Sequence, residues 1–73
     1  MKRSQFNMFC KMIAGAHKAK VKEYTFIIKE KQNGIYQLLQ QSAGLSIVLK
    51  QGRENECVEA AKDCVQMMYD ITD

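Results

Sequence analysis

The residue types that could carry out catalysis are few, and their spacing does not assemble a reactive site. His17 is the only histidine, so any Ser/His/Asp or Cys/His arrangement that activates a nucleophile must include it. It lies beside a lysine-rich segment, where a solvated histidine is expected. Cys10 is a candidate nucleophile, but it lies on the apolar stripe of a predicted helix, where burial raises the pKa of a thiol. The sequence therefore predicts a protein that is not an enzyme.

Metal and cofactor sites are not indicated either. Cys57 and Cys64 are seven residues apart, about 10 Å along one face of a helix. That separation is too large for one tetrahedral ion, whose cysteine ligands are usually closer in sequence. The glycines at 34, 44 and 52 are isolated turn residues without the clustered pattern that cradles phosphates. We expect neither a metal ion nor a cofactor.

The net charge of +3 is unevenly distributed along the chain. Residues 51–73 carry two basic and six acidic side chains, whereas residues 1–22 carry six basic side chains and no acidic one. The six are Lys2, Arg3, Lys11, Lys18, Lys20 and Lys22. A basic end of this kind can bind RNA or DNA. Two neighbouring helices of opposite charge, or two chains packed head to tail, would use the same asymmetry.

With 73 residues the chain is long enough for one small domain, residues 1–73. No apolar core of a secretion signal follows the basic start, and no stretch reaches the roughly 18 apolar residues that cross a bilayer. Three cysteines are an odd number and are most simply buried thiols in a reducing compartment. We therefore expect a cytoplasmic protein without a membrane segment.

The elements that would position any site follow from the change of hydrophobic period. Apolar residues recur every three or four positions from Ser4, the expected N-cap, to about Lys18, and again in a helix that Asn55 would cap. Between them lie three predicted strands, Tyr24–Lys31, Ile35–Gln41 and Leu45–Lys50, with turns at Asn33-Gly34 and Ser42–Gly44. The predicted fold is α+β, a two-layer αβββα domain with two helices on one face of a three-stranded antiparallel sheet.

The face of the sheet away from the helices is the predicted interaction surface. A two-residue loop at Asn33-Gly34 would pair Ile28 with Leu39. The open face then carries apolar residues among lysines, namely Ile27, Tyr36 and Leu38 with Lys29 and Lys31 around them. A loop of another length would shift this register. An uncovered edge strand is a second adhesive feature, so we expect a homodimer formed through the edge or the open face.

Two family resemblances bear on function. The order of helix, three strands and helix is similar to the double-stranded-RNA-binding domain, which holds phosphates with lysines at the start of its second helix. The matching segment here, Arg53–Glu56, carries two acids that would repel the nucleic-acid backbone. The nucleic-acid interpretation therefore depends on the basic N-terminal segment.

The second resemblance covers residues 24–69. Its features are Tyr24–Glu30, Asn33-Gly34, Tyr36, Ala43-Gly44, Gly52 and the segment Glu56–Val65. These resemble the strand and helix core of HicB-type antitoxins, although a basic helix precedes the core here and the final strand and DNA-binding tail of the family are absent. The resemblance implies a non-enzymatic protein that occludes a partner protein and often dimerises. A phage or mobile-element inhibitor of a host enzyme would work by the same logic.

Overall fold

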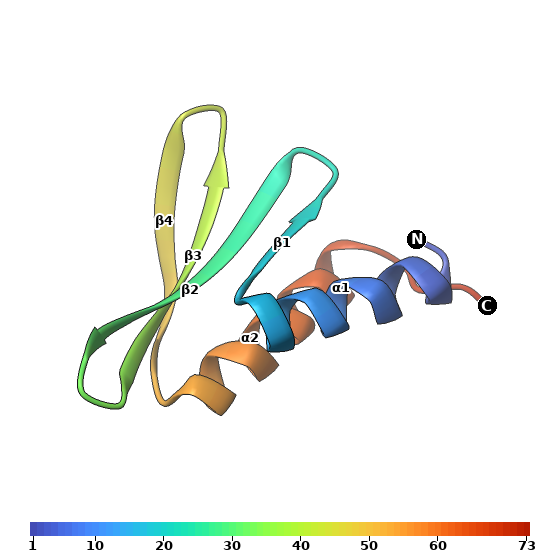
Figure 1. Ribbon diagram of the computed structural model, residues 1–73. Helices are drawn as coiled ribbons and strands as arrows, with labels where there is room; N and C mark the ends of the chain where they lie inside the picture. Colours follow the sequence, from blue (N-terminus) through green and yellow to red (C-terminus); the bar gives the residue numbers. More distant parts are fainter.

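The computed structural model describes all 73 residues, which form two helices and a four-stranded antiparallel sheet (Figure 1). The elements in chain order are α1 (Arg3–Ala16), β1 (Lys18–Val21), β2 (Tyr24–Gln32), β3 (Ile35–Ser42), β4 (Leu45–Gly52) and α2 (Glu54–Met68). The strands are neighbours in that same order. The predicted α+β class is confirmed, whereas the prediction of three strands is wrong.

The additional strand is β1, since the sequence predicted a helix to about Lys18 and no element between there and Tyr24. His17 takes a left-handed conformation (φ 58°) and ends α1. Ala19 and Val21 then alternate with exposed lysines and are buried. A four-residue strand that contains two lysines has little β propensity of its own. Its pairing with β2 and the burial of two small side chains beneath α1 stabilise it instead.

Both helices lie on one face of the sheet, so the molecule has two layers (Figure 1). Helix α1 covers β1 and β2, while α2 covers β3, β4 and part of β2. The core between the layers contains Phe6, Phe9 and Ile13 of α1, Cys57, Val58, Ala61 and Val65 of α2, and Ala19, Val21, Phe26, Ile28 and Leu38 of the sheet. The rings of Phe9 and Phe26 meet edge to face with their centroids 5.5 Å apart. The arrangement of both helices on one side leaves the other face of the sheet bare.

The register between β2 and β3 differs from the prediction. A bulge between Glu30 and Gln32 pairs Ile28 with Leu38 instead of Leu39. Asn33 is not at positive φ, and only Gly34 (φ 75°) is, so the turn is not the two-residue type that requires positive φ at both positions. Either register would bury one of two adjacent leucines. The observed register directs Gln40 toward the helices, and the predicted one would have directed Gln37 and Gln41 there, at a greater desolvation cost.

Helix caps and termini complete the layer. The side chains of Gln5 and Glu56 accept hydrogen bonds from the backbone N–H groups of Lys2 (3.0 Å) and Arg53 (2.8 Å). Lys2 and Arg53 are therefore the N-caps, and the predicted caps Ser4 and Asn55 lie inside the helices. The two chain ends lie side by side (Figure 1), because the Arg3 N–H donates to the Thr72 carbonyl. Neither helix combines the length and the apolarity needed to cross a bilayer.

Candidate functional site

The bare face of the sheet carries an apolar row across its middle. Ile27 of β2, Leu39 of β3 and Val48 of β4 are register partners and lie side by side on this face. Lys18 of β1 pairs with Ile27 and extends the row to the edge of the sheet. Ile27 and Leu39 are half-buried by their neighbours, and Val48 is 50% exposed. The row therefore presents an apolar surface that neither helix covers.

Polar and basic residues flank this apolar row on both sides. On one side lie Lys29, Gln37 and Gln51, and the Gln37 side chain donates to Gln51 Oε1 at 3.0 Å. On the other side lie Lys20, Thr25, Gln41 and Ser46. None of the paired residues that project from this face is acidic. We call this surface the open face. Its residues are Lys18, Lys20, Thr25, Ile27, Lys29, Gln37, Leu39, Gln41, Ser46, Val48 and Gln51.

Some of the predicted interface residues lie on the open face and others do not. Ile27 and Lys29 project from it, and Lys31 is exposed at the bulge. Leu38 is completely buried beneath the helices. Tyr36 points to the helix side, where its ring centroid lies 6.0 Å from that of His17 and where the charge of Glu30 raises its pKa. The placement of Tyr36 and Leu38 on the open face was wrong because the bulge at residue 31 changes the phase of β3.

Leu39 and Val48 are open-face residues that the sequence did not predict. The neighbouring leucines at 38 and 39 made the two phases of β3 equally apolar. A signal was nevertheless present, since the phase that exposes Leu39 also exposes Gln37 and Gln41. Counting glutamines in addition to apolar residues would have favoured the observed register.

The six basic residues of the N-terminal segment do not converge on one surface. Lys18 and Lys20 project from the open face, whereas Lys11 lies on α1 in the other layer. Arg3 forms an exposed ion pair with Asp73 (3.4 Å), and Lys2 caps α1. The Lys22 ammonium stacks on the Tyr69 ring, 4.4 Å from its centroid. Only Lys18 and Lys20, joined by Lys29, form a basic group on a common face.

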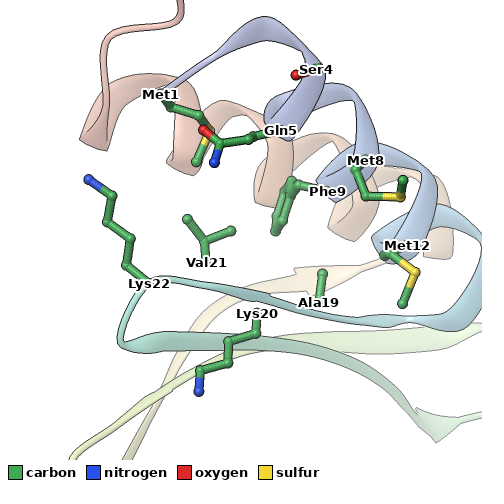
Figure 2. A pocket seen from close by; sticks show the side chains of 10 residues that line it. All are labelled: Met1, Ser4, Gln5, Met8, Phe9, Met12, Ala19, Lys20, Val21 and Lys22. Atoms are coloured by element: carbon green, nitrogen blue, oxygen red, sulfur yellow. The ribbon is translucent and has the colours of Figure 1, made fainter.

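A groove of about 690 Å³ separates α1 from the free edge of β1 (Figure 2). Phe9, Ala19 and Val21 form its buried floor. Met8 and Met12 line its helix side and are exposed. Lys20 points from β1 away from the groove floor, as Figure 2 shows. The groove is therefore apolar inside, with lysines along the strand that borders it.

His17 and the three cysteines, the residues considered for catalysis, make contacts that hold the fold together or are at least partly buried. His17 Nε2 lies 2.6 Å from Glu54 Oε2, and its backbone carbonyl accepts from the Ile28 N–H at 2.8 Å, so His17 ties the end of α1 to the sheet and to α2. It is not the solvated histidine that the sequence predicted, since its side chain is only 28% exposed. Burial raises the pKa of the thiols of Cys10, Cys57 and Cys64. All three cysteines are free, and no group of three or more His, Cys, Asp or Glu side chains has the geometry to hold a metal ion.

Comparison with protein-family models, with curated proteins and with solved structures finds no match for this chain. The resemblance to HicB-type antitoxins therefore stays a prediction.

Proposed function

We propose that this chain is a non-enzymatic protein-binding module, a small inhibitor that occludes a partner protein with the open face of its sheet. One observation carries the proposal: the row of Ile27, Leu39 and Val48 is apolar and left bare by both helices. Apolar patches on a small domain usually mark a contact surface, because burying them against a partner is favourable. The occluding mode is the one that the resemblance to antitoxins implies.

The charges around the row indicate the character of the partner. Lys18, Lys20 and Lys29 surround it without an acidic counterpart on the same face. Complementary charge on a partner speeds association and fixes its orientation. We therefore expect the partner to present an apolar patch bordered by Asp and Glu residues.

The test compares two substitutions that each remove one apolar side chain. Cross-linked capture from the native cell is performed with the wild-type chain, with Leu39→Gln on the open face and with Met8→Gln on α1, where Met8 is exposed outside the open face. We expect one protein to be captured by the wild-type chain and by Met8→Gln, and its affinity for Leu39→Gln, measured with the purified partner, to fall at least about tenfold. Far-ultraviolet circular dichroism checks that both variants remain folded. Equal affinity for Leu39→Gln rejects the open face.

A nucleic-acid-binding function is the second candidate, because Lys18, Lys20 and Lys29 share one face. Three phosphate contacts would make the logarithm of affinity for a generic duplex fall with that of the salt concentration, with a slope of about −2.7. Lys20→Gln would reduce the magnitude of that slope by about 0.9. Absence of duplex binding at low salt rejects this function and leaves the protein-binding one.

A further inference from the structure

Strand β4 is an edge of the sheet that nothing in the chain covers. It pairs only with β3, so the backbone groups along its other side have no partner in the sheet. Its eight residues include none that is buried. The tip of the β3–β4 hairpin stands clear of both helices (Figure 1). Consequently Leu45 (71% exposed) and Ile47 (56%) have no helix above them, although they project toward the helix side of the sheet.

The apolar character of this edge continues onto α2. A groove of about 450 Å³ runs between the strand and the helix, lined by Leu49, Ala60, Asp63, Cys64, Met67 and Met68. Met67 is 87% exposed, and Asp63 is the only charged residue among the six. Alternation along β4 places Leu49 on this side together with Leu45 and Ile47, and the bulge that follows places Lys50 on the same side. We name the combination of Leu45, Ile47, Leu49 and Met67 the β4 edge surface.

We propose that the β4 edge surface binds a second copy of this chain, forming a two-fold symmetric dimer in which two β4 strands pair antiparallel. The five residues from Leu45 to Leu49 carry no charge, so two copies can face one another without like charges in contact. The β1 edge offers no equal match, because it has four residues and two of them are lysines. A surface that is complementary to itself closes under two-fold symmetry and does not grow into a filament.

Antiparallel pairing also covers the exposed tip of the β3–β4 hairpin in each copy. It places the Leu45 end of one β4 beside the Gly52 end of the other. Helix α2 begins near that second end, at Glu54. The uncovered side chains of Leu45 and Ile47 then approach the layer that the partner's helix provides. Each copy thus supplies the helix layer that the other lacks above its hairpin tip.

The dimensions lie near the low end of those of a specific dimer, with a projected area of about 520 Å² per partner before side-chain relief is added. An eight-residue strand is about 26 Å long, and a helix layer on a sheet layer is about 20 Å deep. A strip of roughly 26 by 20 Å, rough with side chains, is of the same order as the roughly 800 Å² that each partner buries in a standard interface. The open face remains accessible in this dimer and becomes continuous across two copies, so the dimer does not depend on what that face binds.

The oligomeric state of the purified full chain tests the proposal. Sedimentation equilibrium from about 1 μM to about 1 mM should show a species of twice the 8.4 kDa chain mass for the wild type. Ile47→Lys places a charge in the paired edge and should weaken dimerisation at least about hundredfold. Met8→Lys, an exposed apolar residue beside the opposite edge, is the matched control and should leave the dimer unchanged.

Amide hydrogen exchange identifies the strand involved. In the wild type, exchange of the β4 backbone amides should slow as concentration rises, and it should not do so in Ile47→Lys. Three results would each overturn the proposal: a wild-type monomer throughout this range, a dimer that Ile47→Lys leaves intact, or slowed exchange in β1 in place of β4. Protection of β4 only when a different protein is added would assign the edge to that partner and reject the second copy. None of these outcomes bears on Leu39→Gln, so the proposed function is decided separately.

Discussion

The two edge strands of this sheet, β1 and β4, differ in length, burial and charge. Strand β1 has four residues, of which Ala19 and Val21 are buried beneath α1, and the other two are lysines. Strand β4 has eight residues, none buried, and its first five carry no charge. Short length and charged side chains are devices that prevent an edge strand from pairing with another chain. The β1 edge has both devices, whereas the first five residues of β4 have neither, and Lys50 and a bulge follow only toward the end of that strand.

This difference indicates that the two edges have different roles. The β1 side is the better packed within a single chain, because Ala19 and Val21 are buried beneath α1, although a groove lined by Met8 and Met12 stays open beside it. Its lysines disfavour pairing with strands of other molecules. The β4 side is incomplete in a single chain, because its apolar residues extend past the reach of α2 (Figure 1). A chain of 73 residues can bury only a modest core, and the proposed second copy at β4 would add apolar burial where the monomer has least.

Truncating one apolar side chain on each side of the sheet should give the largest difference in the free energy of unfolding. Phe9→Ala removes a buried ring that packs on Phe26 and should lower the free energy of unfolding by about 3–5 kcal/mol. Leu49→Ala, at a half-exposed position of β4, should lower it by less than about 1.5 kcal/mol. Urea unfolding measured in the monomeric Ile47→Lys background isolates the single chain. Equal losses would contradict the view that the β1 side is the better packed.

Removing the lysines of β1 should abolish the difference between the edges. The double variant Lys18→Thr, Lys20→Thr leaves β1 paired with β2 but uncharged, with residues that favour strands. We expect species larger than a dimer, since β1 can then pair with a free edge at a gain on the order of 1 kcal/mol for each removed repulsion. Sedimentation velocity detects them. Lys29→Thr, in the interior of the sheet, is the control and should remain a dimer.

The contrast between the edges explains how far the sequence could be interpreted. Both helices, the three longer strands and the bare face follow from hydrophobic period and turn residues, which are local signals. The strand at 18–21 could not be recognised, because tertiary cover by α1 stabilises it more than its own composition does. The phase of β3 depended on whether Gln40 or the pair Gln37 and Gln41 lies under the helices. That choice belongs to the packed layers and cannot be inferred from Asn33-Gly34 alone.

A substitution in the β3–β4 turn should stabilise the hairpin that carries the β4 edge surface. Ala43 (φ 51°) and Gly44 (φ 81°) both have positive φ, the pattern of a turn that favours Asn-Gly. Ala43→Asn should therefore raise the free energy of unfolding by about 0.5–1 kcal/mol, since asparagine tolerates the left-handed region better than alanine. Thermal unfolding measures the change. Ala43→Val, which is β-branched, should have the opposite sign, and a gain from both variants would contradict the turn geometry.

Alkaline titration gives the smallest effect and tests how the β4 side is anchored. Cys57 is completely buried where α2 meets the end of β4, and its burial raises the pKa of the thiol above its ordinary value of 9.0. Because the unfolded chain releases this proton first, the stabilisation is fully present below pH 9 and is lost as pH rises through the folded pKa. Urea unfolding between pH 7 and pH 10.5 should show a decline above pH 9 that is shallower in Cys57→Ala, although that variant is less stable at pH 7. Cys64→Ala, whose thiol is partly exposed, should change the slope less. If the free energy of unfolding falls with pH equally steeply in Cys57→Ala, this thiol is hydrated in the folded chain. Water then reaches the contact between α2 and the end of β4.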